Sequence, residues 1–221
     1  MKASSWIIIL CCFVTVIASV FPSLVEFLAF TPSDLYHLRL WTLVTALFLH
    51  SGLLHLVSNM IFLFVLGRTL ERVTDTKKFL TVFFVGGIAS FLLSVPFYKP
   101  DVFMVGASAA IFSVASADML IAPLSFSMIF LAPVGAIALL YFVYNIIAVY
   151  YGISGNVAYI SHIIGFALGI PFGILWSKQW KKNLGISIIL LIVYVILGLI
   201  ISRLIAEYST HSLSLLTSNQ H

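Results

Sequence analysis

Charged residues are scarce in this 221-residue chain: Asp, Glu, Lys and Arg make up 8% of it, against about a quarter in a typical soluble domain. So little charge excludes an ordinary water-soluble globule and a disordered chain. Cysteine is scarce as well, because Cys11 and Cys12 are the only two and are adjacent. Neighbours on a helix point about 100° apart, so these two do not bridge each other and a disulfide-stapled secreted module is excluded. A glycine-rich phosphate loop and a CxxC pattern are also lacking.

Apolar residues dominate the chain, at 62% of the sequence and with a mean hydropathy of +1.18. They form long unbroken runs, whereas a membrane β-barrel would alternate in short segments. The sequence therefore predicts an all-α polytopic membrane protein. Seven spans are expected, at about Trp6–Leu28, His50–Leu70, Phe79–Phe97, Gly106–Ile121, Phe126–Tyr150, Val157–Trp176 and Leu184–Ile205.

The spans are expected to form a single domain, 1–221, with a core at about 5–177. A basic hinge, Lys178–Asn183, would lead to one additional C-terminal span at about 184–205 and a short polar tail at 206–221. The first span is interpreted as an uncleaved anchor rather than a signal peptide, because its apolar character continues past Pro22. The fourth span is short and rich in small residues, so we expect other helices to surround it.

The distribution of Lys and Arg predicts a cytoplasmic N-terminus. With that orientation the inner ends of the spans hold Lys2, Arg68, Arg72, Lys77, Lys78, Lys178, Lys181 and Lys182, and the outer ends hold Arg39, Lys99 and Arg203. Between the first two spans, residues 31–49 are too polar to cross a bilayer and too apolar to form a free loop. We expect this stretch to lie at the outer interface as an amphipathic segment.

Polar side chains within the spans need a reason, because each is costly in a bilayer. They are His50, His55, Asn59, Ser108, Asp118, Asn145 and His162. Singly, most have a structural interpretation: a serine bonds its own helix, a histidine packs, and Asp118 reaches water at the inner end of its span. Asn145 has no identifiable partner. His50 and His55 are poorly spaced to hold one metal ion from a single helix.

Three of these residues fall at one depth, which favours a joint role. His55, Ser108 and His162 each lie within about 10 Å of the outer start of a span that runs inward. Ser108 follows Gly106 at the start of a helix, where the first amides have no intrahelical partner. His55 and Asn59 share a helix face, four residues apart. Together these four side chains offer a nucleophile, a base and hydrogen-bond donors for an oxyanion.

A small-residue face beside His162 predicts which helix it meets. Ser161, Gly165 and Gly169 recur every four residues, and the span that carries Ser108 is itself rich in Ala and Ser. Small residues let helix backbones approach closely. We therefore expect the fourth and sixth spans to pack against each other.

The motifs resemble, in order, those of the rhomboid family of intramembrane serine proteases. His50, His55 and Asn59 match the family's HxxxxHxxxN, Gly106-Ala-Ser108-Ala109 resembles GxSG, and His162 with Gly165 and Gly169 matches HxxGxxxG. The resemblance covers about Leu35 to Ser177 and extends to Gly67 and Glu71. One position departs from the pattern: Ala109 stands where the family usually has glycine.

The resemblance implies a Ser–His dyad, with Ser108 as the nucleophile and His162 as the general base. The Ser108 amide and the side chains of His55 and Asn59 would form the oxyanion hole, and no acidic third member is expected. His50 would hold the interfacial segment, and Phe112 would stack on the histidine. Supporting positions are His50, Gly106, Phe112, Gly165 and Gly169.

The resemblance also implies partners and a location. Substrates would be single-span or polytopic membrane proteins, cut near the outer interface after the fifth span opens as a lateral gate. No metal, cofactor or nucleic acid is implied, and the expected place is the plasma membrane of a prokaryote with the site open to the outside. Two alternatives remain: a non-proteolytic rhomboid-like protein that binds clients, and a small transporter with a histidine proton path.

Overall fold

The computed structural model describes residues 2–153 and 158–218, with side chains as far as 208. Within that part of the chain, five helical stretches are long and apolar enough to cross a membrane, and α7 and α8 are shorter apolar helices. The predicted all-α polytopic class is confirmed. In chain order the apolar helices are α1 (Ala3–Val20), α4 (Leu53–Phe62) continued by the π-helical η3 (Leu63–Gly67) and α5 (Arg68–Val73), α6 (Thr76–Ser94) with η4 (Val95–Phe97), α7 (Ser108–Ile121), α8 (Val134–Tyr150), α9 (Tyr159–Trp176) and α10 (Trp180–Ser218).

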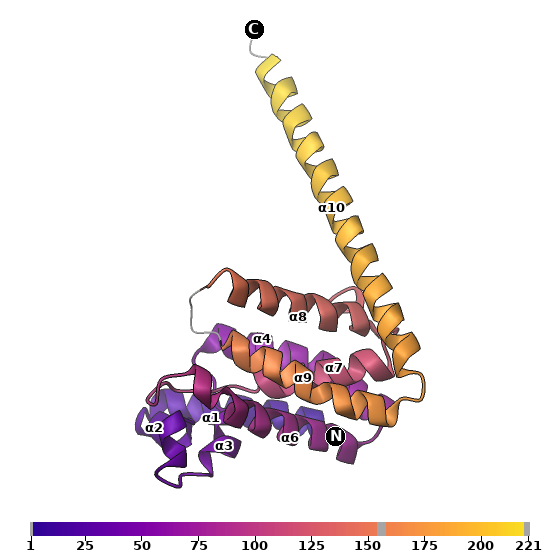
Figure 1. The fold of residues 1–221 in the computed structure, drawn as a ribbon. Coiled ribbons are helices and arrows are strands. Elements are labelled where there is room, and N and C mark those ends of the chain that lie inside the picture. Colours follow the sequence, from indigo (N-terminus) through magenta and orange to yellow (C-terminus); the bar gives the residue numbers. More distant parts are fainter. Residues whose placement is uncertain (1, 154–157, 219–221) are drawn as a thin grey trace.

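Helix α7 is the centre of the bundle. Every residue from Ser108 to Leu120 is buried, and α4, α6, α8 and α9 all contact this helix (Figure 1). The short span is therefore surrounded by protein, as its small residues predict. A helix shorter than a bilayer is accommodated because its ends face neighbouring helices rather than lipid.

The contact between α7 and α9 is made by backbone. Gly165 lies against the carbonyl of Ala109, and Gly169 lies against the carbonyl of Ser113, so a Cβ at either glycine would overlap the facing backbone. The Ser113 hydroxyl crosses the same interface and donates to the Gly165 carbonyl at 2.6 Å. This close approach holds the N-terminal halves of the two helices side by side.

The first span is shorter than predicted. Helix α1 ends at Val20, and residues Ser23–Leu28 form a separate helix, α2. Pro22 lies between them. Because proline has no amide hydrogen, it cannot continue the i to i−4 bonding of α1, and the apolar composition alone does not reveal that break.

The fifth span begins later than predicted. Phe126 lies in a short strand, β1 (Phe126–Ser127), which pairs antiparallel with β2 (Ala132–Pro133). Helix α8 then begins at Val134. Pro133 fixes an extended backbone directly before the helix, which suits the N-terminal flank of a helix rather than its interior.

The C-terminal span differs at both ends from the prediction. Helix α10 begins at Trp180, so most of the expected hinge is its first turn, and it continues to Ser218 through the expected tail; residues 219–221 of that tail lie outside the described part. Asn183 donates to the Leu120 carbonyl at 2.8 Å and so ties the start of α10 to the end of α7. Further along α10, the hydroxyls of Ser187 and Tyr194 donate to the Met119 and Leu131 carbonyls, and the helix beyond them projects away from the bundle (Figure 1).

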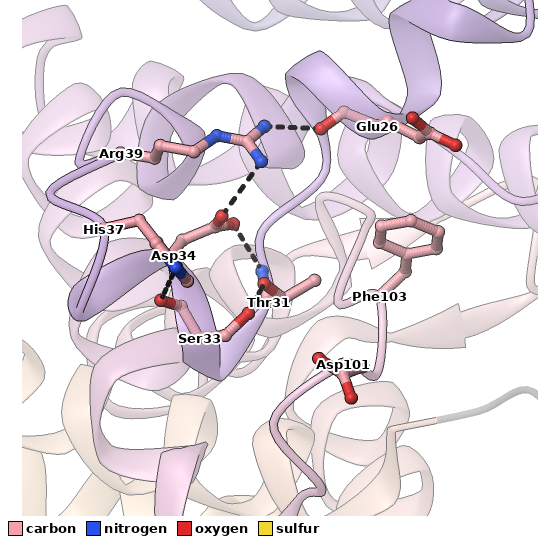
Figure 2. A pocket seen from close by; sticks show the side chains of 8 residues that line it. All are labelled: Glu26, Thr31, Ser33, Asp34, His37, Arg39, Asp101 and Phe103. Carbon is pink, nitrogen blue, oxygen red and sulfur yellow. Dashed lines mark hydrogen bonds and ion pairs between the residues drawn. The ribbon is translucent and has the colours of Figure 1, made fainter.

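The interfacial segment is folded and its internal charges are paired. It contains η1 (Pro32–Leu35), α3 (Thr42–Thr45) and η2 (Ala46–Phe48). Asp34 is buried, accepts from the Thr31 amide at 2.8 Å and pairs with Arg39 at 3.2 Å. Figure 2 shows Arg39 between Asp34 and the Glu26 carbonyl, at the edge of a pocket of about 460 Å³. Arg39 thus fastens this segment to α2 without leaving its charge unpaired.

Glu71 fastens α1 and α6 to α5. Its carboxylate is 1% exposed and accepts four hydrogen bonds. The donors are the amides of Ala3 and Ser4 and the hydroxyls of Ser4 and Thr76. A carboxylate at the start of α1 also suits the positive end of the helix dipole.

Replacing Glu71 with Ala is expected to lower the free energy of unfolding by about 3 kcal/mol or more, because charged hydrogen bonds are lost and buried donors are left unsatisfied. Unfolding of the purified protein in detergent micelles measures the effect. Glu26→Ala is the matched control, since Glu26 is exposed. Equal stability of the two variants would contradict a structural role for the Glu71 carboxylate.

Candidate active site

Ser108 is placed by a turn that needs glycine. Gly106 has a φ of +114°, which side chains disfavour, and its amide donates to the Ala46 carbonyl at 2.9 Å. A Cβ at Gly106 would lie 2.8 Å from Cε1 of His55. The turn therefore brings the His55 ring against the backbone directly before Ser108, the first residue of α7.

Ser108 and His162 meet across the α7–α9 interface. The Ser108 Oγ lies 2.7 Å from His162 Nε2, and the two residues are 8% and 4% exposed. The other ring nitrogen of His162, Nδ1, lies 2.8 Å from Oδ1 of Asn145 on α8. Three helices thus contribute one side chain each to a continuous hydrogen-bonded row.

A stack of aromatic rings fixes the plane of the imidazole. Phe112 stacks on His162 with ring centroids 4.6 Å apart and planes 15° apart. Tyr141 of α8 stacks on Phe112 with ring centroids 4.2 Å apart. Phe62 of α4 stacks in turn on Tyr141, with ring centroids 4.3 Å apart. The column leaves the imidazole little freedom to tilt, so its two nitrogens keep their directions.

His55 lies against the turn and Asn59 lies one helical turn further along α4, but part of the hydrogen-bonding capacity of both side chains is already used. The Asn59 Nδ2 donates to the His55 carbonyl at 2.8 Å, within its own helix. The His55 Nδ1 lies 3.0 Å from the Ser51 hydroxyl, while its Nε2 side faces Gly106. Each side chain keeps one N–H position for another acceptor.

His50 links α1 to the turn. Its backbone amide donates to the Thr15 hydroxyl at 3.2 Å, and its Nε2 accepts from the Ala107 amide at 3.4 Å. The same Thr15 hydroxyl lies 3.4 Å from His50 Nδ1 and 3.4 Å from the carbonyl oxygen of Phe48, so the contacts of His50 extend from α1 and the turn to the end of the segment 31–49. His50 thus helps to hold the backbone that precedes Ser108 in place.

Asp118 does not reach water, contrary to the sequence interpretation. It is 0% exposed, and neither of its carboxylate oxygens has a hydrogen-bond partner in the described part of the chain. It follows Ser108 by ten residues, or about 15 Å along α7, and so lies outside the row. Within residues 2–153 and 158–218, no group of three His, Cys, Asp or Glu side chains is arranged to hold a metal ion.

A family model decides the relationship of this chain to known proteins. The model for the Rhomboid domain matches residues 37–179, a stretch that includes α4 to α9 and every residue of the row. The chain belongs to the rhomboid family. The rhomboid motifs thus coincide with the parts of the fold that bring Ser108 and His162 together.

Curated relatives of this rhomboid match over part of their length. A stretch of 76 residues is 43% identical to Rhomboid-like protease 3 of Toxoplasma gondii and covers 34% of this chain and 28% of that protein. RHOMBOID-like protein 7 of Arabidopsis thaliana is 34% identical over 79 residues, which cover 36% of this chain and 25% of the relative. The matches therefore span about a quarter of the length of these relatives. Both organisms are eukaryotes, so they lend no support to the expected prokaryotic plasma membrane.

Proposed function

We propose that this rhomboid is an intramembrane serine endopeptidase in which Ser108 attacks the substrate and His162 acts as the base. The observation that carries the proposal is the 2.7 Å separation of Ser108 Oγ and His162 Nε2. Neutral His162 takes the hydroxyl proton as Oγ bonds to a peptide carbonyl carbon, and then gives that proton to the leaving amine. In the second half of the reaction His162 takes a proton from water as the water oxygen attacks the acyl carbon. His162 then gives that proton to the Ser108 Oγ, and the carboxylic acid product leaves.

The start of α7 stabilises the oxyanion in this mechanism. The Ser108 amide has no intrahelical acceptor, and His55 and Asn59 lie on the neighbouring α4. These donors are fixed before the reaction begins, so little reorganisation accompanies the development of charge on the carbonyl oxygen.

Replacing Asn59 with Ala is expected to lower kcat by about 100-fold or more, because one preformed donor to the oxyanion is lost. The measurement is the cleavage rate of a single-span test substrate in proteoliposomes. Ser58→Ala is the matched control, because the Ser58 hydroxyl also donates to the His55 carbonyl, at 3.1 Å, from the adjacent position on α4. Full activity of Asn59→Ala would assign Asn59 to packing alone.

Substrate entry requires a helix to move, because the dyad is buried. Helix α8 covers it through Tyr141, which stacks on Phe112, and through Asn145. Helix α8 therefore acts as the lateral gate. A helix hides its carbonyls, so substrate segments that unwind easily, with Gly, Pro or other small residues, are favoured.

The site faces the extracytoplasmic side in this proposal, because the Lys and Arg residues gather at the opposite ends of the spans. A pocket of about 270 Å³ lies between the end of α8 and the start of α9, where Tyr159 lines it. Tyr159 packs edge-on against His162 at 6.4 Å, so the ring of Tyr159 lies between this pocket and the base.

A serine-directed fluorophosphonate probe tests the proposal. The purified wild-type protein in proteoliposomes is expected to become covalently labelled. Ser108→Ala is expected to remain unlabelled because, among the residues that the structure describes, Ser108 provides the hydroxyl that lies against His162 Nε2. Equal labelling of the two proteins would overturn the role of Ser108. Absence of labelling in the wild type, with clients still bound, would favour the non-proteolytic alternative.

A further inference from the structure

We propose that Asn145 is a positioning residue that holds His162 in the tautomer able to accept the Ser108 proton. The inference rests on the proposed function and adds to the serine and the histidine a third side chain, carried by α8. Sequence reasoning gave Asn145 no partner, whereas its Oδ1 lies 2.8 Å from His162 Nδ1.

The orientation of the Asn145 amide is fixed by its own helix. Its Nδ2 donates to the Tyr141 carbonyl at 2.7 Å, and a carbonyl oxygen can only accept. Turning the amide over would place Oδ1 against the Tyr141 carbonyl, with two acceptors in contact and no hydrogen between them. The Oδ1 atom must therefore face His162.

This orientation determines the tautomer of His162. Because Oδ1 can only accept, the hydrogen of the neutral imidazole lies on Nδ1. The lone pair is then on Nε2, which faces the Ser108 Oγ at 2.7 Å. In the other tautomer Nε2 would carry the hydrogen and could not take the serine proton. Asn145 also keeps its hydrogen bond when His162 becomes positively charged during the attack.

Burial leaves no solvent acceptor that could take the place of Asn145 beside His162 Nδ1. It is 1% exposed and His162 is 4% exposed, so bulk water does not supply another acceptor for Nδ1. In the described part of the chain, the hydrogen bonds of the His162 ring are those to Ser108 and Asn145. An Nδ1–H without Asn145 would be buried and unsatisfied, which favours the wrong tautomer or a turned ring.

The location of Asn145 couples the base to the gate. Helix α8 covers the dyad, so its outward displacement breaks the contact between Asn145 and His162. His162 is then held in its base form only while α8 lies against α9.

Two substitutions of Asn145 test the inference. Asn145→Leu removes the acceptor with little change in size, and kcat is expected to fall about 10- to 100-fold, as for other groups that orient a histidine, while KM stays near the wild-type value. Asn145→Asp keeps an oxygen that faces His162 but loses the Nδ2 donor to the Tyr141 carbonyl, so it is expected to recover part of that loss. Asn183→Leu is the matched control: it removes the part-buried hydrogen bonds of the Asn183 amide to the Leu120 and Ile121 carbonyls and the Ser177 hydroxyl, so stability falls while kcat is retained.

The tautomer itself is measured by ¹⁵N NMR of histidine-labelled protein. Wild-type His162 is expected to carry its hydrogen on Nδ1, and Asn145→Leu is expected to shift the population towards Nε2–H. An Nε2–H tautomer in the wild type, or an unchanged kcat in folded Asn145→Leu, would overturn the inference and leave the proposed function standing. If the wild type neither cleaves nor reacts with the probe, the proposed function fails, and the wild-type tautomer still decides the inference. The same wild-type measurement decides it if Asn145→Leu does not fold.

Discussion

Replacing Ser108 with Ala is expected to abolish cleavage of a single-span substrate, with a loss of about 10⁴-fold or more in kcat, because the nucleophile itself is removed. The fold is expected to survive, since the Ser108 hydroxyl contacts His162 and the substitution removes one buried atom. Cleavage is measured in proteoliposomes with purified protein, and unfolding in detergent is measured in parallel.

Ser94→Ala is the matched control for this loss. Ser94 is fully buried in α6, and its hydroxyl donates within its own helix to the Ser90 carbonyl at 2.6 Å. The control removes the same atom outside the row and should retain full cleavage. Persistent cleavage by purified Ser108→Ala, at a rate near that of Ser94→Ala, would contradict a serine-protease mechanism.

Replacing Gly169 with Ala is expected to have the next largest effect, through geometry rather than chemistry. The added methyl group would overlap the Ser113 carbonyl and the Ser116 hydroxyl of α7, so the two helices must separate. Overpacking of this kind costs about 3 kcal/mol. Separation also moves His162 away from Ser108, and a misplacement of about 1 Å lowers a catalytic rate by about 100-fold.

Gly185→Ala provides the comparison for this substitution. Gly185 lies in α10, where an added Cβ meets no atom within 4 Å, so stability and cleavage should be retained. Unfolding temperature and kcat are measured for both variants. A Gly169→Ala protein that matches Gly185→Ala in both would show that backbone contact between α7 and α9 does not set the distance between Ser108 and His162.

The sequence carried enough information to place the helices that matter most. Their apolar length predicts the spans, and the four-residue spacing of Gly165 and Gly169 predicts a close helix contact because only small side chains permit it. The Ala- and Ser-rich stretch after Ser108 completes that interface. The glycine spacing and the content of small residues can both be read from short stretches of the chain. The contact between α7 and α9 can therefore be predicted from the sequence.

Other features depend on contacts that no local pattern records. Asn145 is a single amide in an apolar helix, and its partner His162 follows 17 residues later on another helix. The sequence predicts that Asp118 contacts water at the end of its span. Whether it does so depends on how many helices surround α7, and the sequence of α7 alone does not show that number. The C-terminal end of α1 depends on Pro22 and the N-terminal end of α8 on Pro133. A hydropathy profile does not reveal either boundary, because it does not register the missing amide hydrogen of proline.

The proposed reaction depends most on the chemistry of one oxygen atom, the Ser108 Oγ. The most direct measurement is an experimental structure of the protein after reaction with a fluorophosphonate. The account predicts a covalent bond between phosphorus and the Ser108 Oγ, with His162 Nε2 still beside that oxygen. A phosphorus atom on any other residue, or a Ser108 that stays unmodified while His162 points elsewhere, would contradict it.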